Sequence, residues 1–254
     1  MSRSTGGRKN AARAKQPGVG QSAPRDFTYG SLEHILYVLK ALDAAYMFSS
    51  LPEDEFATGE PLDGLILTLL SQNTNDKNRD MAYDALRAQF PSWRGAAASS
   101  AAEIARLIRP AGLGDTKSSR MMEILRKISE DFGEYSLVKM FDMTPDEVKS
   151  YLSALPGIGP KTVGCVMAFD LAMPSFPVDT HVARISRRLG WAAEKAAPEK
   201  IQDFLEATVP PEYHRWGHLD MIEHGRRTCR ARRPDCAACA VKDVCPAKKD
   251  DTDG

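Results

Sequence analysis

Four cysteines lie close together near the C-terminal end of this 254-residue chain and could hold a metal centre. Six, two and five residues separate them, and no export signal accompanies them, so metal binding in a reducing compartment is favoured over disulfides. Four thiolates suit either tetrahedral zinc or an iron–sulfur cluster. Zinc ribbons usually carry two C-x2-C pairs, whereas this chain has one pair with uneven flanking gaps, which favours a cluster and leaves zinc open. The four residues are Cys229, Cys236, Cys239 and Cys245.

A glycine-containing turn precedes a lysine that could act as a nucleophile. The segment Leu155–Thr162 reads LPGIGPKT and is expected to join two helices tightly. Its glycines allow close backbone approach of a partner, and free N–H groups at the start of the next helix suit a phosphate oxygen. The same residues also fit a plain interhelical turn that binds nothing.

Lys161 follows Pro160, the expected first residue of the helix after this turn. The helix dipole disfavours an ammonium in that first turn, and burial in a cleft would add to the effect. A neutral amine could then attack a sugar carbon or an aldehyde, whereas an exposed lysine would contact phosphate instead. Asp179 precedes another amphipathic helix and is predicted to be its N-cap, a position from which its carboxylate could still face a cleft. Cys165 lies among small and apolar residues and is expected to be buried.

Helices must position these residues, because helical periodicity recurs along the chain and no alternating strand pattern is convincing. Apolar residues from Leu32 to Leu42 share one helical face. Capping boxes that begin at Ser100 and Thr144 predict two further helix starts. We therefore expect an all-α fold. Other helices are expected at residues 61–71, 76–90, 116–131, 160–169, 180–189, 198–209 and 211–224.

The formal net charge is zero, which weighs mildly against a nucleic-acid binder, but positive charge is concentrated locally. Residues 1–27 form a basic tail that we expect to be disordered, with a phosphate-contacting arm and an organelle transit peptide as alternatives. A second basic stretch contains Arg230, Arg232 and Arg233. No apolar run approaches the ~18 residues that cross a bilayer, so no membrane partner is expected. The expected location is the bacterial cytoplasm, with the nucleoid, and organelle targeting stays open.

The segment Leu155–Leu189, with LPGIGPKT and VDTHVARI, resembles the endonuclease III branch of the helix-hairpin-helix DNA glycosylases. The cysteine spacing is similar to the one this branch uses for its [4Fe–4S] cluster. Leu69–Asp76, which reads LLSQNTND, resembles the family's segment that enters the DNA-facing cleft. Gly112–Lys117, which reads GLGDTK, resembles its intercalating loop. The resemblance covers about residues 28–248.

The resemblance implies a role for each matching residue. Lys161 corresponds to the Schiff-base nucleophile, and Asp179 corresponds to the catalytic carboxylate. Leu113 would wedge into the base stack, and Gln72 would fill the space left by a flipped nucleotide. The four cysteines would hold a [4Fe–4S] cluster that orders a basic loop. The backbone contacts to DNA that the resemblance implies come from Gly157, Gly159, Arg230, Arg232 and Arg233.

The resemblance also implies two helical domains on either side of a DNA-binding cleft. A six-helix barrel would span residues 53–173, with the helix-hairpin-helix motif at about 144–170. Residues 28–52 and 174–248 would form the iron–sulfur cluster domain, and 249–254 a short tail.

The activity implied is that of a base-excision-repair DNA glycosylase with AP lyase activity. Its partner would be duplex DNA with a flipped, damaged or modified pyrimidine, bound by a monomer. A monofunctional glycosylase for mismatched or alkylated bases is one alternative, although such enzymes usually lack the lysine. A non-catalytic DNA-binding module is another, and it would leave Lys161 and Asp179 unexplained. Pro160 stands where the family often has a cation, so one phosphate contact is expected to be missing. The runs VGCV at 163–166 and SQNT at 71–74 resemble the plant 5-methylcytosine glycosylases, which leaves the pyrimidine substrate open.

Overall fold

The computed structural model describes residues 27–52, 55 and 59–248, and these residues form helices and connecting loops without a β-strand. The predicted all-α class is confirmed. The predicted basic tail, apart from Phe27, and the C-terminal tail lie outside the described residues. None of the described helices is long and apolar enough to cross a membrane.

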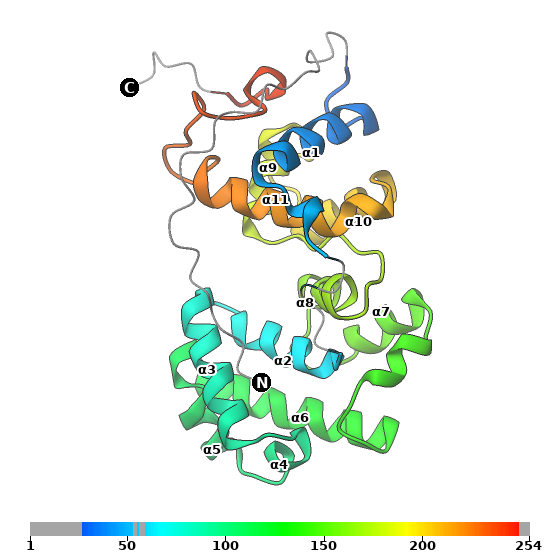
Figure 1. The fold of residues 1–254 in the computed structure, drawn as a ribbon, viewed down its shortest axis with the longest axis vertical. Coiled ribbons are helices and arrows are strands. Elements are labelled where there is room, and N and C mark those ends of the chain that lie inside the picture. Colours follow the sequence, from blue (N-terminus) through cyan, green and yellow to red (C-terminus); the bar gives the residue numbers. More distant parts are fainter. Residues whose placement is uncertain (1–26, 53–54, 56–58, 249–254) are drawn as a thin grey trace.

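Seven α-helices from the middle of the chain share one hydrophobic core, drawn in cyan to green in Figure 1. The long helix α6 crosses this group, and Ile124 and Leu125 from α6 are fully buried against Leu65 and Leu69 from α2. The seven helices are α2 (Pro61–Ser71), α3 (Asp76–Gln89), α4 (Trp93–Ala97), α5 (Ala101–Leu107), α6 (Gly114–Phe132), α7 (Pro145–Ser153) and α8 (Pro160–Cys165).

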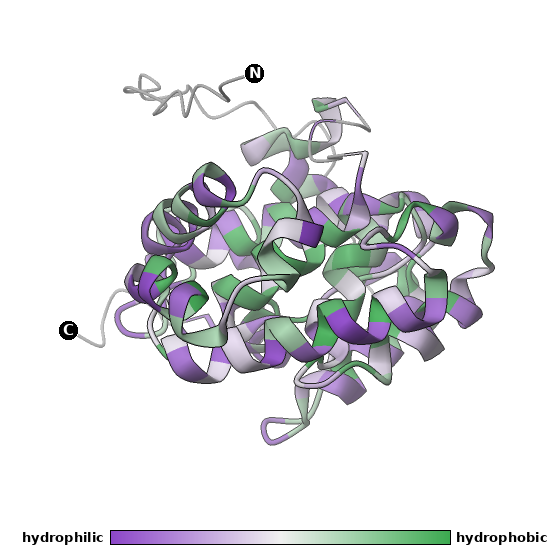
Figure 2. Cartoon of the chain, turned by 90° about the horizontal axis from the view of Figure 1, so that it is seen from below, coloured by the Kyte–Doolittle hydropathy of each residue, from purple (hydrophilic) through white to green (hydrophobic). Residues whose placement is uncertain are grey.

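The two ends of the described chain build a second core. Helix α1 packs on α11, and the His34 imidazole is hydrogen-bonded to the backbone carbonyl of Val244 (3.0 Å). Figure 2 shows apolar segments turned to the interior and polar segments on the outer helix faces. The helices of this group are α1 (Leu32–Tyr46), α9 (Thr180–Arg188), α10 (Pro198–Thr208) and α11 (His214–Arg227). Two separate cores support the predicted division at residues 53–173, and we keep those boundaries as a proposal.

Side-chain caps start most of these helices where the sequence places them. Thr144 and Glu147 form the predicted reciprocal capping box of α7. The Ser100 side chain accepts a hydrogen bond from the Glu103 amide (3.1 Å). Within the described residues, however, the Glu103 carboxylate accepts no hydrogen bond from the Ser100 amide. The prediction of a full capping box at Ser100 is therefore wrong, because the Glu103 carboxylate is not turned back toward the cap.

Helix α8 does not end at Cys165 but continues as one π-helical turn, η4 (Val166–Asp170). Asp170 at its end lies against Gly64 of α2, so closely that a Cβ on Gly64 would overlap both carboxylate oxygens. Burial, together with the nearby Asp63 carboxylate, raises the pKa of Asp170 to about 7. The glycine thus lets α8 and η4 pack directly onto α2.

Candidate functional site

The turn between α7 and α8 is a tight hairpin that leaves two backbone donors without an acceptor among the described residues. Gly157 has φ +72°, a left-handed conformation that favours glycine. Ile158 is buried and anchors the turn, and its amide donates to the Leu155 carbonyl (3.3 Å). In the part of the chain that the structure describes, the N–H groups of Gly157 and Gly159 donate no hydrogen bond. The hairpin therefore offers two free amides.

Lys161 and Asp179 are brought to the same place from different segments. Lys161 lies in the first turn of α8 and is partly exposed. Asp179 caps α9, and its Oδ1 accepts hydrogen bonds from the amides of His181 and Val182 (both 2.8 Å). Burial raises the pKa of the Cys165 thiol, while Lys161 lowers it and Asp179 raises it through their charges. The Lys161 amine and the Asp179 carboxylate both act electrostatically on this buried thiol, and the predicted N-cap role of Asp179 is confirmed.

The two segments expected to enter DNA lie around this hairpin and at the start of α6. Gln72 directly follows α2, and its side-chain amide donates to the carbonyl of Gly157 (3.3 Å). Leu113 is 57% exposed and has φ +52°, an unfavourable conformation for a branched side chain. A strained, exposed leucine is typical of a functional position rather than of a core one.

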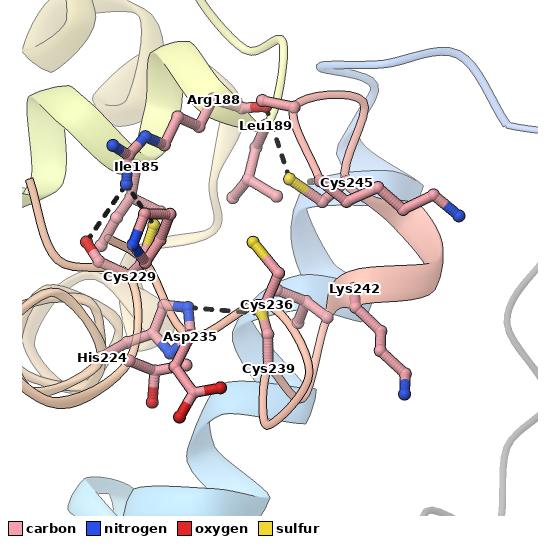
Figure 3. Close-up of a pocket in the computed structure, with 15 residues that line it drawn as sticks. Ile185, Arg188, Leu189, His224, Cys229, Asp235, Cys236, Cys239, Lys242 and Cys245 are labelled. Atoms are coloured by element: carbon pink, nitrogen blue, oxygen red, sulfur yellow. Dashed lines mark hydrogen bonds between the residues drawn. The ribbon is translucent and has the colours of Figure 1, made fainter. Parts of the chain in front are cut away.

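The four cysteines line one pocket between α9 and the C-terminal loops (Figure 3). All four are free thiols, and their sulfur atoms face the same hollow. Within residues 27–52, 55 and 59–248, no three cysteine, histidine or acidic side chains are close enough to share one metal ion. Tetrahedral zinc needs sulfur atoms about 3.8 Å apart, since each Zn–S bond is about 2.3 Å.

The pKa values of two of these thiols are raised, so their ionised forms would need a positively charged partner. Burial raises the pKa of Cys239 to about 11, and it raises that of Cys245 as well. Without a cationic partner these groups stay protonated at neutral pH. Arg188 already donates from Nη1 to the Cys229 sulfur (3.2 Å). Burial thus favours the neutral thiols of Cys239 and Cys245, while Arg188 places one positive charge beside Cys229.

The arginines of the cysteine loop differ in their availability. Arg226 of α11 pairs with Asp76 of α3 (2.9 Å), which links the two helical groups. Arg230, Arg232 and Arg233 are exposed, and none forms an ion pair among the described residues. These three guanidinium groups remain free to meet an anionic partner.

Comparison with known proteins places this chain in a family. Residues 66–211 match the HhH-GPD superfamily of base excision DNA repair proteins. This chain belongs to that superfamily. It is 34% identical to endonuclease III of Thermotoga maritima over 188 residues, which cover 73% of this chain and 83% of that enzyme. It is 35% identical to an Arabidopsis thaliana protein named as a DNA glycosylase, over 73% of this chain but only 64% of that relative.

The fold agrees with these matches. A solved endonuclease III in a non-covalent DNA complex superposes with a TM-score of 0.73 at 25% identity, over 85% of this chain and 96% of that one. The prediction of an endonuclease III-like HhH-GPD protein, with the base-excision glycosylase and lyase class, is thereby confirmed.

His218 of α11 lies near the candidate site and was not identified from the sequence. Its Nδ1 lies 2.7 Å from the Pro177 carbonyl, which can only accept, so that nitrogen carries the proton. Burial lowers the pKa of His218 well below its usual range, although Asp179 opposes the shift. The imidazole is therefore neutral at pH 7 and leaves Nε2 as an acceptor. It holds the strand-like approach to Asp179 against α11.

Lys117 of α6 is the second residue that the sequence did not reveal. It is only 1% exposed, and its Nζ donates to the carbonyls of Leu70 (2.7 Å) and Ala111 (2.9 Å). Leu70 lies two residues before Gln72, and Ala111 lies two residues before Leu113. One buried amine thus fixes both segments that the family resemblance assigns to DNA insertion.

We predict that Lys117→Met lowers the free energy of unfolding by about 2–4 kcal/mol, because two buried carbonyls lose their donor. Urea unfolding monitored by circular dichroism measures the change. Lys127→Met is the matched control, since Lys127 lies on the same helix and makes only partly exposed contacts, with Asp131 (2.9 Å) and the Tyr151 ring. Its cost should stay below about 1 kcal/mol. Equal costs for the two variants would show that Lys117 does not tie the loops together.

Proposed function

We propose that this protein removes damaged or modified pyrimidines from duplex DNA and then cleaves the abasic strand, with Lys161 as nucleophile. The observation that carries this proposal is the shared environment of Lys161 and Asp179 around Cys165 and His218. A non-catalytic DNA-binding module would not require an amine and a carboxylate that share one buried neighbour next to the hairpin. The bound substrate would be a duplex with one nucleotide flipped out of the stack.

Lys161 acts on the sugar in this proposal. The Nζ lone pair forms a bond to C1′ as the N-glycosidic bond breaks and the base leaves with the bonding electrons. Loss of a proton from nitrogen and opening of the sugar give an imine. The imine acidifies the C2′ proton, and its removal expels the 3′ phosphate by β-elimination. The first step requires the neutral amine, and Lys161 lies in the first turn of α8 beside the hairpin.

Asp179 supports the same step. Its Oδ1 is occupied by two amides of α9, whereas Oδ2 forms no hydrogen bond within the described ranges. The free oxygen is available to take a proton from the Lys161 amine or to stabilise positive charge on the sugar. The helix cap fixes the carboxylate in one orientation, so little reorganisation is needed during reaction.

The DNA contacts follow from the hairpin and the loops. The amides of Gly157 and Gly159 would bind a backbone phosphate without reading sequence. Leu113 would wedge into the stack, and Gln72 would occupy the space of the extruded nucleotide. We also propose that the enzyme acts as a monomer in the bacterial cytoplasm, in line with the bacterial endonuclease III relative.

Cys229, Cys236, Cys239 and Cys245 would hold a [4Fe–4S] cluster. When bound, such a cluster supplies fixed geometry to a loop that has little apolar core of its own. Arg230, Arg232 and Arg233 project from this loop and would contact the DNA backbone.

Borohydride trapping tests the nucleophile, because reduction of the imine leaves a stable link between enzyme and DNA. Duplexes with an abasic site, thymine glycol, uracil, a G·T mismatch or 5-methylcytosine are offered in parallel. We expect trapping by the parent and none by Lys161→Ala. Lys149→Ala is the control, since Lys149 is an exposed lysine on the preceding helix α7. Trapping that survives in Lys161→Ala would remove this lysine from its role, and no cleavage of an abasic duplex by the parent would exclude lyase activity.

Asp179→Asn separates catalysis from capping, because asparagine is also a good N-cap but carries no charge. We expect single-turnover base excision to slow by about 10²–10⁴-fold, the usual contribution of a proton-transfer group. The free energy of unfolding should change by less than about 1 kcal/mol. A large loss of stability with unchanged chemistry would mean that Asp179 acts only as a cap.

The cluster is tested on the protein as isolated under anaerobic conditions. We expect absorbance near 400 nm and about four iron atoms per chain, as a [4Fe–4S] centre requires. Oxidative removal of the iron should make the segment from Cys229 to Cys245 sensitive to trypsin, while fragments containing α2–α8 persist. Stoichiometric zinc without a visible band would contradict the assignment.

A further inference from the structure

We propose that Arg120 of α6 is a DNA-phosphate ligand that supplies the positive charge of the hairpin between α7 and α8. This inference rests on the proposed function only in taking DNA as the partner. It assigns a second element, distant in sequence, to the phosphate site at Gly157.

The geometry around Gly157 carries the inference. A Cβ built on Gly157 would lie 2.5 Å from Cδ, 2.6 Å from Nε and 2.9 Å from Cζ of Arg120. The arginine side chain therefore lies flat across the glycine, with its guanidinium against the hairpin backbone. Gly157 is required here for two reasons, since its φ is +72° and the arginine fills the space of a side chain.

The distribution of charge around the hairpin makes this guanidinium the group available to bind an anion there. Residues 155–160 include no charged side chain, so the hairpin itself provides only backbone dipoles. Arg120 is partly buried, yet its guanidinium forms no ion pair or hydrogen bond with any other described residue. By contrast, the next two cations on α6, Arg126 and Lys127, pair with Glu130 and Asp131. A partly buried charge without a counter-ion is costly, and an anion at the hairpin would offset that cost.

The chemistry of the two partners is complementary. A guanidinium offers planar, paired donors that match two phosphate oxygens, and it holds its charge at every relevant pH. Arg120 lies against Gly157, and the amides of Gly157 and Gly159 donate no hydrogen bond among the described residues. One phosphate could thus be bound by backbone donors and by the arginine together. Such a contact fixes position on the duplex and carries no sequence preference.

The salt dependence of DNA binding tests the proposal. Fluorescence anisotropy measures the Kd for a duplex with a tetrahydrofuran abasic analogue between 50 and 300 mM KCl. We expect Arg120→Met to reduce the slope of log K against log salt by about 0.9 and to weaken binding roughly tenfold at 0.1 M salt. The loss should be equal for abasic and undamaged duplexes, because phosphate contacts do not read bases.

Arg126→Met is the matched control, since it removes the same charge from the same helix while Arg126 is engaged by Glu130. Its slope should equal that of the parent. Arg120→Lys should restore most of the slope but not the full affinity, because lysine cannot bind two oxygens in one plane. Thermal unfolding of each variant verifies the fold. An unchanged slope in folded Arg120→Met, or an equal change in Arg126→Met, would overturn the proposal. Failure of the parent to cleave abasic DNA would contradict the proposed function and leave this binding result standing.

Discussion

The proposed pairing of the Lys161 amine with the Asp179 carboxylate depends on how α8 and the π-turn η4 pack between two hydrophobic cores. On one side, Gly64 lets the end of η4 lie directly on α2. On the other side, Phe169 of η4 contacts the His218 ring of α11, with 5.7 Å between ring centroids. His218 in turn holds the Pro177 carbonyl two residues before Asp179. Each of these contacts constrains a backbone segment. Lys161 and Asp179 are therefore positioned by elements that are packed against one another.

The same packing explains why buried polar groups are tolerated near the site. Asp170 and His218 are both nearly inaccessible to water, and burial drives each toward its neutral form. Neutral groups cost less to bury than ions, and they do not compete with Lys161 and Asp179 for partners. Lys117 is a different case, because its donors are satisfied by two carbonyls at the ends of two loops. The charged groups near the surface are thus the ones assigned to catalysis and DNA binding in the proposed function.

Local signals in the sequence were sufficient for much of the fold. The cap at Thr144, the proline at the start of α8 and the helical spacing from Leu32 act through neighbours along the chain, so a sequence contains them. The roles of Lys117 and Arg120 could not be predicted in this way. Both residues lie on α6. Lys117 is buried and donates to the Leu70 carbonyl, whereas Arg120 lies across Gly157, and this difference comes from tertiary packing alone. The capping box at Ser100 failed for a related reason, since a motif fixes residue types and not the direction of a side chain.

Helix α9 connects the cysteine pocket to the proposed catalytic carboxylate. Asp179 caps its start, and in its middle Arg184 donates from Nε to the Cys229 carbonyl (3.1 Å). Arg188 then donates from Nη1 to the Arg230 carbonyl (2.8 Å) and to the Cys229 sulfur. The loop that would hold the cluster is therefore bonded to the helix that carries the proposed catalytic carboxylate at its start. Because a nine-residue helix is too short to hold its shape without tertiary contacts, order in the cysteine loop helps to fix the direction of α9, and with it the position of Asp179.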